Sequence, residues 1–155
     1  MCIRDRHNFV LLRAVGQSRR PVLLKRGFGA TVNELILSAE YILNEGNTNL
    51  LLCERGIRTF EAGTRYTLDL SAVPILKAKT HLPVVVDPTH AVGLREFIPQ
   101  MAIASVAAGA DAIMLEVHDS PHSARSDGDQ ALLPETLTKL MPRLRAVANA
   151  IGRDL

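Results

Sequence analysis

Several classes of protein are excluded by what this sequence lacks. Among its 155 residues, no apolar run approaches the roughly 20 residues that span a bilayer. Only two cysteines occur, Cys2 and Cys53, too few for a disulfide framework and typical of a reducing compartment. The formal net charge of +2 is too small to indicate nucleic acid or an anionic membrane as a partner. We therefore expect a cytoplasmic protein that binds neither.

The length and composition are those of one globular domain. Hydrophobic residues make up 47% of the chain and charged residues 22%, which excludes a disordered or collagen-like chain. Residues 1–6 (MCIRDR) do not continue into the pattern that follows, and they match the translation of a transposase sequencing adapter. We expect them to be adapter-derived or otherwise non-native, residues 7–155 to form the domain, and the natural protein to extend further upstream.

Four short apolar runs are predicted to be buried strands: residues 21–24, 49–53, 83–86 and 112–115. Each is followed or ended by a charged residue, and these recur about every 30 residues, the length of one strand–helix unit. The charged residues are Lys25, Glu54, Asp87 and Glu116. Because the carboxyl ends of parallel strands meet at one edge, we expect these four to lie together.

The segments between the strands are predicted to be helices. Residues 31–34 (TVNE) form a capping-box pattern that opens a helix ended by Gly46. Shorter or less regular helices are expected over 70–79 and 97–108, and residues 8–15 resemble the end of an earlier helix. A final amphipathic helix covers 134–151, with a kink or break expected at Pro142.

Alternating strands and helices predict an α/β fold with a parallel sheet. An open doubly wound sheet would usually carry a glycine-rich phosphate loop, and the sequence contains neither G-x-G-x-x-G nor a Walker motif. The alternative is a (β/α)8 TIM-type barrel, which has its active site at the carboxyl ends of its strands and needs about 250 residues. Four units in 155 residues indicate the second half of such a barrel, strands five to eight.

Cationic side chains gather after the first two predicted strands. Five of them follow these strands closely: Lys25, Arg26, Arg55, Arg58 and Arg65. Arginine forks match phosphate and carboxylate oxygens, and lysine adds a point charge, so the pattern favours a pocket for an anionic substrate. The alternative is a set of solvated loops with scattered surface ion pairs.

The last two strands are followed by candidate metal ligands. His90 lies in the segment DPTH, Glu116 follows the fourth strand, and Asp127 lies in a Ser-Asp-Gly turn. One imidazole and two carboxylates suit a divalent metal of the Mn, Fe, Co or Zn type, with open positions for substrate. A lone histidine is more often a structural hydrogen-bonding residue, and Asp127 could serve only the turn, so both readings stay open.

The motifs around these residues resemble those of a known family. The segments are PVLLKRG, LCERGIRTFE, TLDLSAVP, VDP-HA-G, LEVH and SDG-Q-L-PE, in order and at compatible spacing. Together they resemble the C-terminal half of 3-deoxy-D-arabino-heptulosonate 7-phosphate (DAHP) synthase, in the class most similar to 3-deoxy-manno-octulosonate 8-phosphate synthase. The resemblance implies a (β/α)8 barrel.

The resemblance also implies an activity and site roles. The family is a transferase that condenses phosphoenolpyruvate with erythrose 4-phosphate and releases phosphate, the first step of the shikimate pathway to chorismate and the aromatic amino acids. It implies that Lys25 and Arg55 hold phosphoenolpyruvate and that His90, Glu116 and Asp127 are metal ligands. We assign Lys25 and His90 as catalytic, and expect a homo-oligomer at full length. The expected substrate-binding set is Lys25, Arg26, Arg55, Arg58, Arg65 and His90.

Some positions depart from the family pattern. Thr89, Val92 and Tyr66 replace its usual residues, and its GPCSVE, KPRTS and IGAR segments do not occur in this sequence. Two alternatives therefore remain: an octulosonate-type or related phosphoenolpyruvate-condensing enzyme, and a non-catalytic half barrel that binds phosphate-bearing ligands. We expect the 155-residue chain to be inactive alone.

Overall fold

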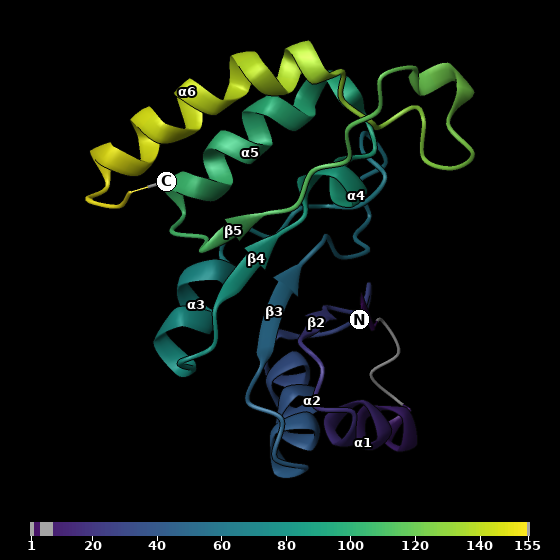
Figure 1. Ribbon diagram of the computed structural model, residues 1–155, viewed down its shortest axis with the longest axis vertical. Helices are drawn as coiled ribbons and strands as arrows, with labels where there is room; N and C mark the ends of the chain where they lie inside the picture. The colour runs from purple at the N-terminus through teal and green to yellow at the C-terminus, as the bar shows by residue number, and fades with distance from the viewer. Residues whose placement is uncertain (1, 4–7, 155) are drawn as a thin grey trace.

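A parallel sheet forms the centre of the computed structural model, which describes residues 2–3 and 8–154. Five strands follow one another in the order β1-β2-β3-β4-β5, every neighbouring pair parallel (Figure 1). The four predicted runs are confirmed as four adjacent strands. The strands are β1 (Cys2–Ile3), β2 (Val22–Lys25), β3 (Leu50–Glu54), β4 (Val84–Val86) and β5 (Ala112–Ile113).

Strand β1 was not expected from the sequence. Cys2 pairs with Leu23 and Ile3 with Leu24, so β1 lies beside β2, where strand four of a barrel would lie. Within segment 1–6, only these two residues are described. Residues 1 and 4–6 lie outside the described residues, and the adapter origin expected for segment 1–6 stays a prediction.

Helices follow the strands and pack on one side of the sheet (Figure 1). Parallel strands with helices outside form half of a (β/α)8 barrel. Among the described residues, no helix is both long and apolar enough to cross a membrane. The helices are α1 (Phe9–Gln17), α2 (Val32–Asn44), α3 (Ala72–Lys79), α4 (Pro88–Val92), α5 (Ile98–Ala107) and α6 (Pro134–Ala150), with 3-10 turns η1 (Arg95–Phe97) and η2 (Pro121–Ser123).

Two helix boundaries test the sequence signals directly. The capping box is confirmed, since Thr31 Oγ1 accepts a hydrogen bond from the Glu34 N–H at 3.2 Å and Glu34 Oε2 accepts from the Thr31 N–H at 2.8 Å. Helix α1 is a complete helix rather than the end of one, because the Asn8 side chain caps its first turn. Helix α6 continues through Pro142, so the chain does not break there, and the alternative of a kink stays a prediction. Pro142 is exposed, which leaves the carbonyl freed four residues earlier open to water.

Alternate side chains of the strands face opposite sides of the sheet. Val22, Leu24, Leu50, Leu52, Val84 and Val86 are buried in one core cluster with residues of α1, α2 and α3. A second cluster joins α5 to α6. By the same alternation and the strand register, Lys25 and Asp87 lie on the opposite face, which lines the interior of a barrel. Glu116 lies three residues beyond β5, on the same side as His90. Glu54 lies on the helix-covered face, although it too ends a strand.

Candidate active site

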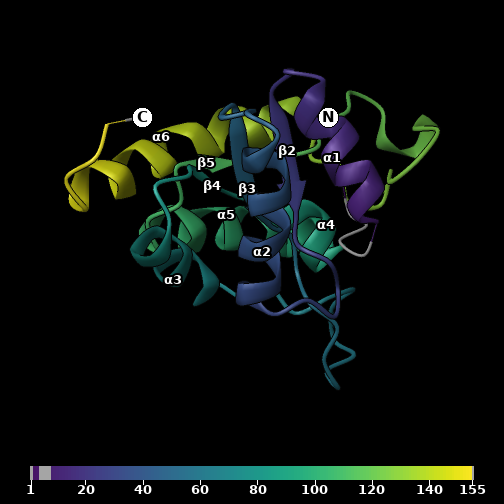
Figure 2. The ribbon, with the colours of Figure 1, turned by 90° about the horizontal axis from the view of Figure 1, so that it is seen from below.

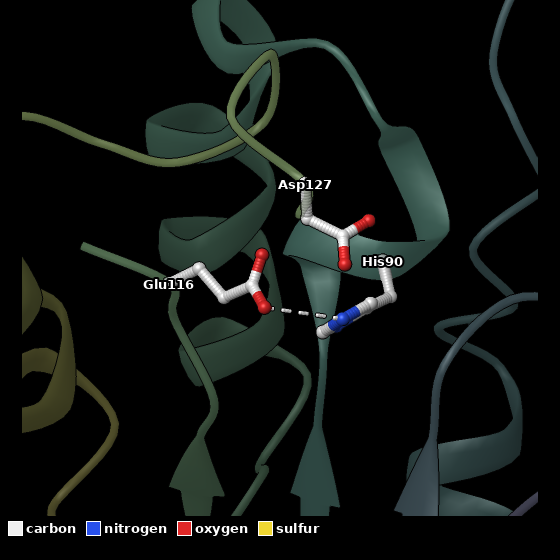
Figure 3. Close-up of side chains that lie close together, drawn as sticks. All are labelled: His90, Glu116 and Asp127. Carbon is white, nitrogen blue, oxygen red and sulfur yellow. Dashed lines mark ion pairs between the residues drawn. The ribbon is translucent and has the colours of Figure 1, made fainter. Parts of the chain in front are cut away.

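Three candidate metal ligands come together at the carboxyl edge of the sheet. His90 lies in α4, Glu116 follows β5, and Asp127 lies between η2 and α6; one ligand atom of each lies within 4.8 Å of the other two (Figure 3). His90 Nε2 and Glu116 Oε1 are 3.4 Å apart. Ligand atoms about 2.0–2.3 Å from one shared ion would lie within about 4.6 Å of each other, so a small closure suffices. The donor set and spacing therefore fit a divalent ion.

The orientation of His90 is set by Asp87. Asp87 caps the short helix α4, its Oδ1 accepting from the His90 backbone N–H at 3.1 Å. The same carboxylate lies 2.8 and 3.0 Å from the Nδ1 atom of His90. Because an ionised carboxylate only accepts, Nδ1 carries the proton of this contact, and Nε2 is the ring nitrogen that faces the other candidate ligands. No helix was predicted from the sequence at this position.

Lys25 is tied to the same carboxylate. Its Nζ atom donates to Asp87 Oδ2 at 2.8 Å, and the Asp87 side chain is fully buried. Burial alone would raise the pKa of Asp87, but hydrogen bonds from His90 and Lys25 outweigh it and hold the pKa below its usual value. The carboxylate therefore stays charged and fixes Lys25 beside His90.

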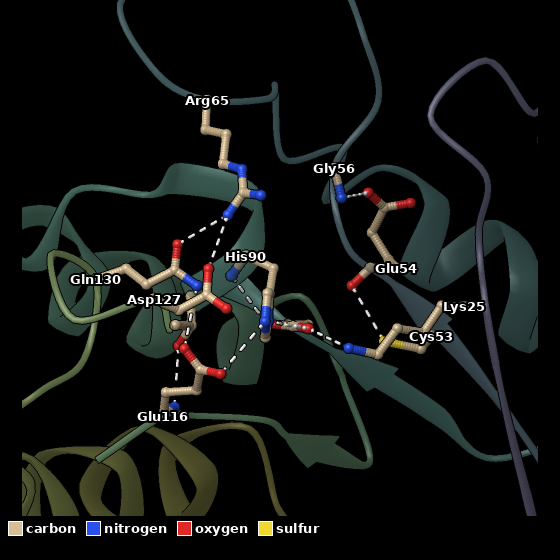
Figure 4. A network of polar contacts seen from close by, with 11 residues as sticks. Lys25, Cys53, Glu54, Gly56, Arg65, His90, Glu116, Asp127 and Gln130 are labelled. Atoms are coloured by element: carbon tan, nitrogen blue, oxygen red, sulfur yellow. Dashed lines mark hydrogen bonds and ion pairs between the residues drawn. The ribbon is translucent and has the colours of Figure 1, made fainter. Parts of the chain in front are cut away.

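On the other side of the candidate metal site, Gln130 bridges two charged residues. Its Nε2 donates to Glu116 Oε2 at 3.1 Å, and its Oε1 accepts from Arg65 Nη1 at 3.0 Å. Arg65 Nη1 also lies 3.3 Å from Asp127 Oδ1. A continuous polar network thus runs from Lys25 through the candidate ligands to Arg65 (Figure 4).

Asp127 adopts a left-handed backbone conformation, with φ of +55°. Non-glycine residues rarely adopt this conformation, but Asp tolerates it better than most. The Gln130 N–H donates to the Asp127 carbonyl at 3.2 Å, so one turn holds both residues. The Ser-Asp-Gly turn and the ligand position are therefore compatible readings of the same residue.

Arg26 and Glu54 form a separate buried ion pair. Arg26 Nη1 lies 2.8 Å from both Glu54 Oε2 and Asp69 Oδ2, and its Nε donates to the Ala30 carbonyl at 2.7 Å. Burial raises the pKa of Glu54, although Arg26 and the Gly56 N–H oppose that rise. These contacts tie together the loops that follow β2 and β3. The substrate-binding role expected for Arg26 stays a prediction.

Arg55 lies against an aromatic pair. The rings of Phe28 and Tyr66 stack with centroids 4.2 Å apart, and the Arg55 guanidinium carbon lies 4.4 Å from the Phe28 centroid and 5.2 Å from that of Tyr66. Arg55 is 1% exposed, so its guanidinium is buried. The two aromatic rings partly stabilise its positive charge. Tyr66, which departs from the family pattern, is thus one wall of the Arg55 site.

Arg58 lies apart from this network. Its side chain is exposed, at the start of the connection between β3 and α3, which extends beyond the rest of the chain (Figure 2). Within that connection, Ile57 and Thr67 pair in antiparallel fashion. The structure therefore brings together five of the predicted site residues and leaves Arg26, Arg55 and Arg58 around them. The five are Lys25, Arg65, His90, Glu116 and Asp127.

Sequence reasoning gave no site role to Asp87 or Gln130. A signal existed for Asp87, since an Asp three residues before His90 with Pro88 between them is a helix-capping pattern. Gln130 belongs to the quoted segment SDG-Q-L-PE, but its contacts carried no signal, because Glu116 and Arg65 are distant in the sequence.

Comparisons with known proteins identify the family. The model of the DAHP synthetase I family matches residues 3–151. The phospho-2-dehydro-3-deoxyheptonate aldolase of Thermotoga maritima is 50% identical over 149 residues, covering 96% of this chain and 44% of the relative. The chain belongs to the DAHP synthetase I family. The resemblance inferred from the motifs is thereby confirmed.

Solved structures support the same family fold. The crystal structure of the T. maritima DAHP synthase superposes with a TM-score of 0.96 at 49% identity, covering 99% of this chain and 46% of that one. A 2-dehydro-3-deoxyphosphooctonate aldolase of Desulfosudis oleivorans is 34% identical, over 90% of this chain and 53% of the relative. The octulosonate alternative is therefore the weaker one. The chain spans about half the length of the curated relatives that it matches.

Proposed function

We propose that this chain, within a complete barrel, catalyses the condensation of phosphoenolpyruvate with erythrose 4-phosphate, as a 3-deoxy-7-phosphoheptulonate synthase. One observation carries the proposal: two of the expected substrate-binding cations, Lys25 and Arg65, are tied through buried side chains to a His–Glu–Asp group that fits a divalent metal. An anion site joined to a metal site suits a reaction between a phosphorylated enol and an aldehyde. We also propose a cytoplasmic, homo-oligomeric enzyme of the shikimate pathway.

In the proposed reaction, the enol carbon of phosphoenolpyruvate bonds to the aldehyde carbon of erythrose 4-phosphate. The aldehyde oxygen takes up a proton and becomes a hydroxyl group. Water adds to the carbon that bears the phosphate and loses a proton, and the bond from that carbon to the phosphate oxygen then breaks, which releases inorganic phosphate and leaves a ketone. A divalent ion held by His90, Glu116 and Asp127 would supply Lewis-acid polarisation of the aldehyde oxygen.

The chain's own residues bind and orient the anions. Lys25 presents its ammonium group from the sheet, where it is 10% exposed and held by Asp87, so it offers a fixed positive charge to a carboxylate or phosphate. Arg55, which follows β3 and lies against two aromatic rings, is the second cation that we assign to the anion, through its planar guanidinium. Arg65 adds a third cation beside Asp127. Since all three stand at the carboxyl edge, one bound phosphoenolpyruvate would approach the metal ligands.

The test uses a hybrid barrel, in which this chain replaces the matching part of the T. maritima relative and so follows that relative's N-terminal half. Consumption of phosphoenolpyruvate is measured with erythrose 4-phosphate and Mn²⁺. We expect metal-dependent turnover by the hybrid barrel and none by the 155-residue chain alone. Turnover only with arabinose 5-phosphate would favour the octulosonate reaction, and binding without turnover would favour the non-catalytic alternative.

Matched variants test the metal ligands. Glu116→Gln and Asp127→Asn should abolish metal-dependent turnover, because each removes a carboxylate from the ligand group. Glu135→Gln and Asp119→Asn make the same chemical changes at exposed positions and should leave turnover unchanged. Full activity in Glu116→Gln and Asp127→Asn would overturn the assignment of these two ligands.

A further inference from the structure

Gln130 is a buried amide between two charged groups of the candidate site. Gln130 is only 3% exposed. Both ends of its amide form hydrogen bonds: Nε2 donates to Glu116 Oε2, and Oε1 accepts from Arg65 Nη1. An amide is suited to this place because it donates at one end and accepts at the other, whereas a carboxylate only accepts and an ammonium only donates.

The contact with Glu116 fixes the direction of a carboxylate. Glu116 has two oxygens, and the hydrogen bond from Gln130 occupies Oε2. The other oxygen, Oε1, is then directed at His90, 3.4 Å from its Nε2 atom (Figure 4). Without Gln130, the Glu116 side chain is free to rotate, and the ligand group loses part of its preorganisation.

The contact with Arg65 fixes a cation next to the same group. Arg65 is anchored through its backbone, whose N–H donates to the Val92 carbonyl at 3.0 Å, at the end of α4. Its guanidinium is partly exposed and lies between Gln130 Oε1 and Asp127 Oδ1. Gln130 therefore holds Arg65 at a fixed distance from two candidate ligands.

We propose that Gln130 is a positioning residue that orients Glu116 for the metal and Arg65 for the substrate anion. This inference rests on the proposed function, since it assumes that Glu116 binds metal and Arg65 binds anion. On this proposal, Gln130 touches neither metal nor substrate and acts through its two neighbours. Its substitution should weaken binding of both ligands to a protein that is still folded.

The experiment measures Mn²⁺ binding to the hybrid barrel by electron paramagnetic resonance, without substrate. Gln130→Met removes both hydrogen bonds and keeps a similar length. We expect it to raise the Mn²⁺ dissociation constant about 10–100-fold, as loss of a residue that orients a ligand does. Phosphoenolpyruvate binding to the metal-free protein should also weaken. The melting temperature of the metal-free protein is measured in parallel, to show that the variant is folded.

A matched control exists on the other side of the molecule. Gln17 Nε2 donates to Glu45 Oε2 at 2.9 Å, the same type of pair, on an exposed surface. Gln17→Met should leave both dissociation constants unchanged. If Gln130→Met fails to fold, Gln130→Asn keeps a polar amide in the same place but is too short to span both partners, and the same rise is expected.

The outcomes separate this inference from the proposed function. Wild-type Mn²⁺ affinity in folded Gln130→Met or Gln130→Asn would overturn the positioning role and leave the metal site intact. Unchanged phosphoenolpyruvate affinity in both variants would overturn the Arg65 part. Absence of Mn²⁺ binding by the unsubstituted hybrid barrel would overturn the metal site itself, and the inference with it.

Discussion

Lys25 and His90 share one oxygen of Asp87: the Nζ atom of Lys25 and the Nδ1 atom of His90 each lie 2.8 Å from Oδ2. A residue expected to bind the substrate anion and a candidate metal ligand are thus held by the same buried carboxylate. Their separation depends on one side chain rather than on two independent loops. Such preorganisation lets a site hold its reactive geometry before ligands arrive.

Asp87→Asn should lower metal affinity and turnover of the hybrid barrel by about 10–100-fold. The carboxylate accepts from three donors, the His90 backbone N–H at Oδ1 and both Lys25 Nζ and His90 Nδ1 at Oδ2. The asparagine amide is uncharged, and its NH2 group replaces one of the two accepting oxygens with a donor, so it cannot satisfy all three. Mn²⁺ titration and steady-state kinetics measure the two losses. Asp119→Asn, at a side chain that is 88% exposed, is the control and should behave as wild type. Unchanged Mn²⁺ affinity in a folded Asp87→Asn variant would show that Asp87 does not orient His90.

Gly56 lies where the chain leaves β3 and has no room for a side chain. Its φ is +90°, and an added Cβ would lie 2.7 Å from Tyr66 Cβ and 2.9 Å from Ala91 Cβ. Gly46 has a similar φ of +86° but open space around it. Gly46→Ala should therefore cost only the backbone strain, about 1 kcal/mol.

Gly56→Ala should cost more, about 2–4 kcal/mol, because overpacking adds to that strain. It should also weaken phosphoenolpyruvate binding, since displacing Tyr66 disturbs the wall behind Arg55. Urea denaturation of the two variants compares their stabilities, and phosphoenolpyruvate titration compares their affinities. Equal losses of stability in Gly46→Ala and Gly56→Ala would mean that Tyr66 and Ala91 move away from the added methyl group without lowering the stability of the fold.

The strands and the charged residues at their ends could be predicted because both signals are local. Short apolar runs indicate buried strands, and parallel connectivity brings their carboxyl ends together. The side of the sheet on which each end residue lies could not be predicted, because it depends on pairing register. Lys25 and Asp87 lie on the interior face, whereas Glu54 lies on the helix-covered face and is buried with Arg26.

Side-chain contacts between distant parts of the sequence could not be predicted either. Arg65 and Gln130 meet only because the loop after β3 and the loop before α6 converge at the same edge. Motif resemblance located Asp127 without this information, whereas the contacts of Gln130 arise only in the folded structure. The helical position of His90 depends on Asp87 acting as an N-cap, a local signal that was not recognised in the sequence.

Away from the site, Asp111 joins three elements at the opposite end of the sheet. Its Oδ1 accepts from Lys77 Nζ and Arg153 Nη2, each at 2.7 Å, and its Oδ2 accepts from the Val84 N–H at 2.8 Å. Burial alone would raise the pKa of Asp111, but the hydrogen bonds from Lys77, Val84 and Arg153 outweigh it and lower the pKa. The folded state therefore binds the proton of this group less readily than the unfolded state does.

Asp111→Asn should destabilise the hybrid barrel by about 1 kcal/mol at neutral pH, since partly exposed ion pairs contribute little each. A group whose folded pKa is depressed stabilises the fold fully above its unfolded pKa of about 3.9, and that contribution is lost as pH falls through the lower folded value. The difference in urea midpoint between wild type and Asp111→Asn should thus be present at neutral pH and shrink below about pH 4. Asp119→Asn, at an exposed carboxylate, should show no such difference. A gap between wild type and Asp111→Asn that stays constant from neutral to acid pH would show that the charge of Asp111 does not stabilise the fold.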